Sequence, residues 1–170
     1  METLEGEDVR PTTDRVKEAV FSVIQFETEG RVFADLFAGS GQMGIEALSR
    51  GAARAYFADS DKKAVETVKR NLQKTGLADK ARVIHSDYRS FLSMCPERID
   101  IAFLDPPYRT GILPEAMARV AEHMKDTGVI IAENPVNEEL LSNYGEFALD
   151  RQYRYGKIRI STFRHKDFTS

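Results

Sequence analysis

The sequence predicts an α/β protein whose doubly wound, mostly parallel β-sheet carries an antiparallel hairpin at its C-terminal edge. Short apolar strands alternate with amphipathic helices along most of the chain, which is typical of a parallel sheet covered by helices on both faces. A glycine-rich turn follows the first strand, at the place where doubly wound sheets bind ligands. Near the end of the chain, two extended segments meet at Gly156 with no helix between them, which favours a hairpin.

Apolar periodicity gives the elements in order. Near-continuous apolar runs predict buried strands at 31–37, 54–59, 81–85, 99–104 and 128–133. Apolar residues three and four positions apart predict helices at 16–24, 43–49, 62–75, 88–94 and 113–125, with a short one near 138–141. The hairpin strands are expected at 147–155 and 157–163. Thr12 or Thr13 is the expected N-cap of the first helix, and Gly76 is expected to end the third.

The composition predicts one domain that needs neither disulfides nor a structural metal. The chain has 170 residues, of which 42% are hydrophobic and 30% charged, and one domain usually takes about 100–200 residues. Cys95 is the only cysteine, and the three histidines are scattered. The apolar runs are too short to cross a bilayer, and the first residues do not predict a signal peptide. We therefore expect a cytoplasmic protein with no metal site and no membrane partner.

The basic residues are unevenly distributed. The formal net charge of −3 argues against a protein that coats nucleic acid by bulk charge. Six basic residues nevertheless fall between 151 and 166 without an acid: Arg151, Arg154, Lys157, Arg159, Arg164 and Lys166. Near the start, Arg15 and Lys17 oppose the dipole of the helix that they begin, which a nearby anion would explain. Both groups are consistent with a phosphate-binding surface or with a plain solvated edge.

The segment from Asp35 to Gly44 contains the pattern G-x-G-x-x-G between a predicted strand and a predicted helix. Glycines at such a turn let a ligand approach the backbone. An acid about 20 residues further on usually holds ribose hydroxyls. Asp59 has this spacing, while Asp61 is the better candidate for a helix cap. Asp87, after the next strand, is placed either to accept a hydrogen bond from a base amine or to cap the following helix.

Asp35 distinguishes two classes of ligand. A carboxylate just before the glycine turn would repel a pyrophosphate but suits a ligand with a sulfonium or ammonium cation. This favours S-adenosylmethionine over a dinucleotide. The residues expected to contact this cofactor are Asp35, Phe37, Gly39, Ser40, Gly41, Gly44, Asp59, Ser60, Asp87 and Tyr88.

The tetrapeptide Asp105-Pro106-Pro107-Tyr108 follows the fourth predicted strand and indicates the chemistry. Its prolines stiffen a loop where the ligand cleft is expected to open. The Asp105 carboxylate and the Pro106 carbonyl can accept both N–H groups of a planar amine, which aims the nitrogen lone pair at a methyl group. Tyr108 offers a face on which a base can stack. Because such a transfer is mainly a positioning problem, no histidine base is required.

These motifs resemble those of class I S-adenosylmethionine-dependent methyltransferases, and specifically the bacterial 16S ribosomal RNA guanine-N2 methyltransferases. The matching segments are 10–18, 35–41, 44–52, 105–108 and 155–157. The resemblance implies a Rossmann-like, seven-stranded sheet with its last strand antiparallel, and a target-base site at 105–108. It also implies methylation of the N2 amine of one guanine, with ribosomal RNA in a partly assembled small ribosomal subunit as the substrate.

The expected organisation follows from these assignments. A single methyltransferase domain spans 1–170, with an N-terminal segment and helix at 1–27, a cofactor and catalytic core at 31–133, and a basic hairpin at 146–166. We expect a monomer or weak dimer. The catalytic residues are expected to be Asp105, Pro106, Pro107 and Tyr108. The residues expected to contact RNA are Arg10, Arg15, Lys17, Arg109, Arg154, Lys157 and Arg159.

Other functions share part of this pattern. A DNA adenine-N6 methyltransferase uses the same loop but usually carries additional sequence for target recognition. A glutamine-N5 protein methyltransferase commonly has Asn where Asp105 stands. An idle RNA-binding or assembly module would keep the fold but tolerate loss of Asp59, Asp87 and Asp105, all of which are present. An NAD dehydrogenase would need a hydride-transfer residue set that the sequence lacks.

Overall fold

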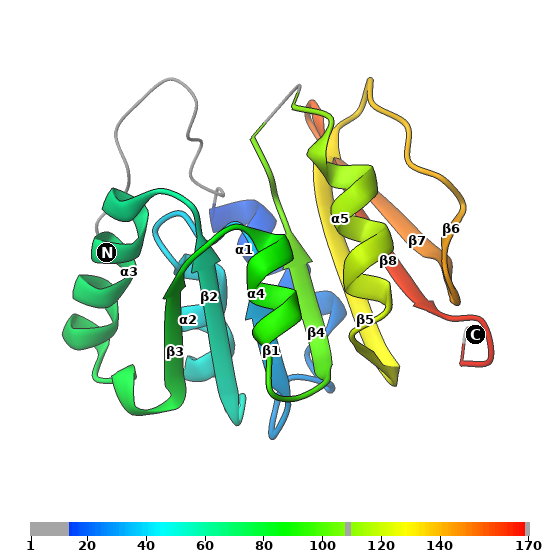
Figure 1. Cartoon of the computed structure of the whole chain (residues 1–170). Helices are drawn as coiled ribbons and strands as arrows, with labels where there is room; N and C mark the ends of the chain where they lie inside the picture. Colours follow the sequence, from blue (N-terminus) through cyan, green and yellow to red (C-terminus); the bar gives the residue numbers. More distant parts are fainter. Residues whose placement is uncertain (1–13, 108–109, 169–170) are drawn as a thin grey trace.

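The computed structural model describes residues 14–107 and 110–168 (Figure 1). Its helices are α1 Asp14–Val23, α2 Gln42–Ser49, α3 Lys62–Thr75, α4 Tyr88–Met94 and α5 Ile112–Ala121, with a 3-10 turn η1 at Ala78–Lys80. Its strands are β1 Val32–Asp35, β2 Arg54–Asp59, β3 Ala81–His85, β4 Ile99–Leu104, β5 Met124–Pro135, β6 Asn143–Tyr144, β7 Phe147–Tyr155 and β8 Ile158–His165.

The strands form one sheet in the order β3-β2-β1-β4-β5-β8-β7-β6. Strands β1 to β5 pair in parallel, while β8 pairs antiparallel with both β5 and β7. The predicted fold class is therefore confirmed. The described residues contain eight strands rather than seven, because the two-residue strand β6 adds to the start of β7.

Two apolar layers cover the sheet. Helices α1, α2 and α3 pack on one face, and α4 and α5 on the other, as Figure 1 shows for α4 and α5. Side chains of β1 alternate between the two layers, since Phe33 belongs to the first and Val32 and Ala34 to the second. Both faces of the central strands are thus buried, which explains why these strands have continuous apolar sequences.

The helix predicted at 113–125 is confirmed as α5 except at its C-terminal end, and the short helix predicted near 138–141 is wrong. The helix predicted at 113–125 ends at Ala121, and Met124 instead opens β5, where it pairs with Ile99. Met124 is buried as expected, but an apolar residue at helical spacing beyond the last turn does not reveal that the chain has already entered a strand. No helix forms near 138–141, since Asn134 Nδ2 donates to the Glu138 carbonyl and holds a turn there.

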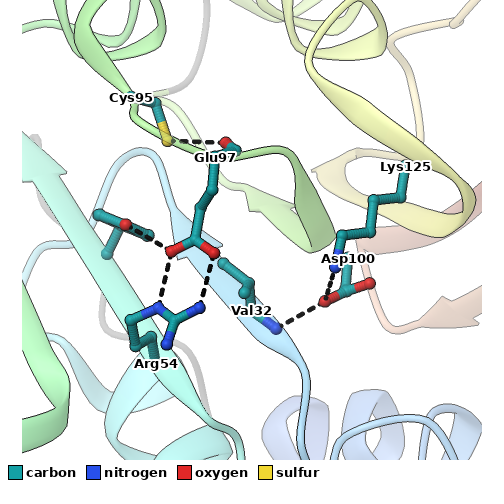
Figure 2. A network of polar contacts seen from close by, with 7 residues as sticks. Val32, Arg54, Cys95, Glu97, Asp100 and Lys125 are labelled. Atoms are coloured by element: carbon teal, nitrogen blue, oxygen red, sulfur yellow. Dashed lines mark hydrogen bonds and ion pairs between the residues drawn. The ribbon is translucent and has the colours of Figure 1, made fainter.

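A polar network ties the strands together at the edge opposite the glycine turn (Figure 2). The Glu97 carboxylate accepts two hydrogen bonds from Arg54, both of 2.7 Å, and a third from the Tyr56 hydroxyl. Beside it, Asp100 at the start of β4 accepts from the Val32 N–H of β1 at 2.8 Å and from Lys125 Nζ of β5. These contacts fix the lower edge of the sheet and keep β1, β2 and β4 in register.

Replacement of Glu97 by glutamine removes the ion pair with Arg54 and is expected to lower the free energy of unfolding by about 1–2 kcal/mol. The effect is no larger because this ion pair is partly solvent-exposed. Arg54 holds the pKa of Glu97 near 2, below its ordinary value of 4.5. Because the pKa of Glu97 is lower in the folded than in the unfolded protein, Glu97 stabilises the fold above pH 4.5. This contribution is lost as the pH falls towards 2. Urea unfolding of both proteins should show the difference at pH 7 and its shrinkage below pH 4.5.

Glu66→Gln, on the exposed face of α3, serves as the control and should change stability little. An equal effect of both substitutions would contradict a structural role for the Glu97 network.

Candidate functional site

The candidate site lies at the carboxyl ends of the parallel strands, along the upper edge of the sheet in Figure 1. The glycine turn follows β1, Asp59 ends β2, and Asp105 follows β4. Strands β2 and β4 flank β1 on either side. The topology therefore brings together the segments that sequence reasoning assigned to the cofactor and to the target.

The glycines of the turn have two different roles. Gly39 and Gly41 have φ values of +58° and +82°, a left-handed conformation that favours glycine. A Cβ on Gly44 would lie 2.3 Å from Cε2 of Phe57, so this glycine permits α2 to pack against β2. The structure gives Gly44 a packing role, as the third glycine of such turns often has, and its expected contact with the cofactor stays a prediction.

Asp59 connects the end of β2 to the glycine turn. Its Oδ2 accepts a hydrogen bond from the Gly39 N–H, and its Oδ1 accepts one from the Asp61 N–H, both at 2.9 Å. Asp61 caps α3 by accepting from the Lys63 N–H, which confirms the assignment of the cap to Asp61. Burial raises the pKa of Asp59. Asp59 therefore lies at the glycine turn, beside the expected cofactor position.

Asp35 is a buried carboxylate at the start of the same turn. Only 2% of the residue is exposed. Burial and the nearby charge of Asp59 raise the pKa of Asp35 to about 7, against hydrogen bonds from the N–H groups of Gly44 and Phe37. Oδ1 has no hydrogen-bond partner within residues 14–107 and 110–168. A buried anion with one unmatched oxygen is suited to a cationic ligand group, and it therefore fits the predicted cofactor.

The aromatic pair Phe37 and Tyr88 borders this region, with ring centroids 5.7 Å apart. Asp87 precedes Tyr88 and caps α4, since its Oδ1 accepts from the Ser90 N–H at 2.8 Å. Of the two roles considered for Asp87, the structure shows the cap. A hydrogen bond to a ligand base would have to share this carboxylate, and that role stays a prediction.

Two residues that the sequence analysis did not identify contact the backbone of the expected cofactor site, at Ser40 and Ser60. The buried Asn71 of α3 donates through Nδ2 to the Ser40 carbonyl at 2.9 Å. A ring nitrogen of His85 lies 2.9 Å from the Ser60 carbonyl. Asn71 could have been identified from its position on the apolar stripe of α3 next to Leu72, because a polar residue there needs a partner.

The loop after β4 is described as far as Pro107. Asp105 is half-buried and Pro106 is buried, while the Pro107 carbonyl accepts from the Thr110 hydroxyl at 2.9 Å. Pro106 and Pro107 line a cavity of about 30 Å³ that extends to the end of β5. Tyr108, expected to stack on the target base, and Arg109, expected to contact RNA, lie outside the described residues, as does Arg10.

Acidic residues from other parts of the chain neutralise much of the predicted basic surface. Lys17 is only 15% exposed and forms ion pairs with Glu46 and Asp14 at 3.6 and 3.9 Å, so Glu46 accounts for a lysine in the first turn of α1. Arg159 contacts Glu139 and the Val136 carbonyl. The Arg15 guanidinium lies 5.4 Å from the ring centroid of Tyr155.

Two further residues of the basic segment are paired as well. Arg164 forms ion pairs with Glu27 and Asp150, and Lys166 pairs with Glu146. In contrast, Arg154 and Lys157 are exposed on the hairpin, where Arg154 donates to the Gly156 carbonyl at 3.0 Å. The RNA contacts predicted for this segment therefore rest mainly on Arg154 and Lys157.

No cluster of three or more His, Cys, Asp or Glu side chains among the described residues is arranged to hold a metal ion. Likewise, none of the described helices has the length and apolar character that crossing a membrane requires.

The fold and the site define a class I methyltransferase architecture. The structure of the "Putative methyltransferase yhhF" from Escherichia coli superimposes with a TM-score of 0.84 at 31% identity, covering 92% of this chain and 88% of that one. The chain belongs to the family described as Conserved hypothetical protein 95, whose model matches residues 1–164.

Two relatives of the chain are named for activity on ribosomal RNA. The "Putative rRNA methyltransferase YlbH" of Bacillus subtilis (strain 168) is 36% identical, over 98% of this chain and 93% of its own length. The "Ribosomal RNA small subunit methyltransferase D" of Escherichia coli (strain K12) is 33% identical, over 93% of this chain and 80% of its own length.

Proposed function

We propose that the protein transfers a methyl group from S-adenosylmethionine to the exocyclic N2 amine of a guanine in small-subunit ribosomal RNA. The observation that carries this proposal is the pairing of two features at one sheet edge. The buried Asp35 carboxylate lies beside the glycine turn, and Asp105-Pro106-Pro107 follows the neighbouring strand β4. The names of the relatives support ribosomal RNA as the acceptor.

Asp35 and Asp59 are the residues that would hold the cofactor. The Asp35 carboxylate would face its cationic part, and Asp59 would accept hydrogen bonds from ribose hydroxyls while it fixes Gly39. When bound, S-adenosylmethionine supplies an electrophilic methyl group.

Asp105 and Pro106 would prepare the target amine. Its lone pair is delocalised into the purine ring, which makes it a poor nucleophile. Two acceptors, the Asp105 carboxylate and the Pro106 carbonyl, would bind both N–H groups and draw the nitrogen towards a tetrahedral geometry with its lone pair directed at the methyl group. The positively charged product would then lose a proton to Asp105 or to water, so the residues serve mainly to position and orient the amine.

The proposal is tested by determining which nucleic acid receives the labelled methyl group. Small ribosomal subunits from cells that lack this modification, free 16S ribosomal RNA and duplex DNA would each be incubated with the protein and methyl-labelled cofactor. We expect label in 16S ribosomal RNA and none in the DNA, as for a protein that acts on ribosomal subunits in the cytoplasm. Label in the DNA, or none in either RNA sample, would contradict the proposal.

Asp59→Ala is expected to weaken binding of S-adenosylhomocysteine by about 1.5–3 kcal/mol, the range for hydrogen bonds to a charged group. Isothermal titration calorimetry measures the change directly. Asp61→Ala is the matched control, because it removes the neighbouring carboxylate that caps α3 and should leave the affinity nearly unchanged. If the control loses affinity and Asp59→Ala does not, the ribose contact belongs to Asp61.

A further inference from the structure

A buried asparagine lies beside the proline loop. Asn134, near the end of β5, is 1% exposed, and it lines the cavity of about 30 Å³ whose wall includes Pro106 and Pro107. Strand β5 pairs with β4, from which the proline loop emerges. Asn134 therefore adjoins the place where the target amine is expected.

The orientation of the Asn134 amide is fixed by the chain itself. Nδ2 donates to the Glu138 carbonyl at 2.8 Å, which leaves Oδ1 as the other end of the amide. Oδ1 is buried and has no hydrogen-bond partner among the described residues. An unmatched buried acceptor costs about 1–3 kcal/mol, and so such an atom on a residue that lines a cavity points to a donor that comes from outside the protein.

The turn that orients Asn134 is itself anchored to the hairpin. The Val136 N–H donates to the Lys157 carbonyl at 2.9 Å, and the Glu138 N–H donates to the Pro135 carbonyl at 3.0 Å. Arg159 donates to the Val136 carbonyl at 3.2 Å. Lys157 and Arg159 of the hairpin thus hold the 135–138 turn, and with it the asparagine amide.

We propose that Asn134 Oδ1 accepts the N1–H of the target guanine and so selects guanine over adenine. The inference deepens the proposed function and rests on it. In guanine, N1–H is the immediate neighbour of the 2-amine, so a base whose amine is bound by Asp105 and Pro106 would present N1–H to the next acceptor along the wall. Adenine has an unprotonated N1, which is itself an acceptor and would oppose the Asn134 oxygen.

The size of the cavity agrees with recognition of one edge of the base. It is smaller than a purine but exceeds the roughly 10–15 Å³ that a single water molecule requires. A donor on the base can replace the hydrogen bond that a water molecule makes with Oδ1, whereas an acceptor cannot. The site would therefore discriminate between bases through one hydrogen bond rather than through shape.

The test compares two bases at the target position of a ribosomal RNA fragment, after the wild-type reaction on whole subunits has located that position. One fragment carries guanine, and the other carries 2-aminopurine, which keeps the 2-amine but lacks N1–H and O6. We expect the wild-type protein to methylate 2-aminopurine at least about tenfold more slowly in kcat/KM. Asn134→Leu should have a kcat/KM on guanine at least about tenfold below that of the wild type. Its kcat/KM values on guanine and on 2-aminopurine should then differ by no more than about threefold.

Asn143→Leu is the matched control, because Asn143 is an exposed asparagine on β6 and should keep the wild-type preference. Thermal unfolding and S-adenosylhomocysteine affinity show whether each variant is folded, and Asn134→Ala replaces Asn134→Leu if the latter does not fold. An Asn134 variant that keeps the wild-type preference would overturn the inference, as would a wild-type protein that methylates guanine and 2-aminopurine at equal rates. Failure of the proposed function would appear separately, as a wild-type protein that forms no N2-methylguanosine.

Discussion

Asp105→Ala should abolish methyl transfer while leaving cofactor affinity nearly intact. The substitution removes one of the two acceptors that would bind the target amine, and loss of a group that positions and polarises a reacting atom typically costs 100-fold or more, on the order of 10²–10⁴. Asp105 follows β4, on the expected target side of the site, whereas Asp35 and Asp59 are the last residues of β1 and β2. We therefore expect the affinity for S-adenosylhomocysteine to stay within about threefold of wild type.

Single-turnover transfer to unmodified subunits measures the first effect, and calorimetry with S-adenosylhomocysteine measures the second. Asp105→Asn is the matched variant, since its amide oxygen can still accept one N–H group, and its rate should fall between those of the wild type and Asp105→Ala. A large loss of S-adenosylhomocysteine affinity in Asp105→Ala would assign this carboxylate to the cofactor instead.

Asp35→Asn should weaken cofactor binding and remove its dependence on pH. A cation can pair with Asp35 only when the carboxyl is ionised, and its pKa is about 7. The wild-type affinity should therefore rise about tenfold between pH 6 and pH 8. The amide that replaces the carboxyl carries no charge at either pH, so Asp35→Asn should bind about 10- to 100-fold more weakly at pH 8, with little change between the two pH values.

In the cofactor-free protein, Asp35→Asn should make the free energy of unfolding less dependent on pH, because the wild type loses stability as the pH rises. A folded-state pKa of about 7, raised from 3.8, means that the contribution of Asp35 to stability is complete below pH 3.8 and is lost as the pH rises through 7. Asp35→Asn should accordingly lose less stability between pH 5 and pH 8 than the wild type does. Asp79→Asn, at an exposed position of η1, is the control.

A pH-independent affinity in the wild type would contradict the pairing of Asp35 with a cation.

Local sequence signals predicted much of the fold because the boundaries have clear chemical markers. The elements at 54–59, 62–75, 81–85, 88–94 and 99–104 match the structure residue for residue. Gly76 ends α3 in the left-handed conformation, and Asp61 begins it as a cap. Such boundaries depend on one or two neighbouring residues, and so they can be read without knowledge of the tertiary structure.

The missed features depend on contacts between distant parts of the chain. Met124 leaves the helix because Ile99 offers it a strand partner, and the segment near 138 turns because the Asn134 side chain holds it. Arg164 pairs with Glu27, which lies 137 positions away in sequence. The basic C-terminal segment therefore appeared more strongly cationic in the sequence than it is in the folded protein.

The site was predicted in the same uneven way. The strand ends placed Asp35, Asp59 and Asp105 at one edge because parallel topology requires it. The unmatched oxygens of Asp35 and Asn134 could not be foreseen, since burial and hydrogen-bond satisfaction depend on the packed structure.

The most direct test of the central claim is the identity of the methylated nucleoside. Small subunits that lack the modification would be incubated with the wild-type protein and S-adenosylmethionine, and their 16S ribosomal RNA would be digested to nucleosides and analysed by mass spectrometry. The account predicts N2-methylguanosine, absent when Asp105→Ala replaces the wild type. N6-methyladenosine in its place would contradict the assignment of guanine as the target.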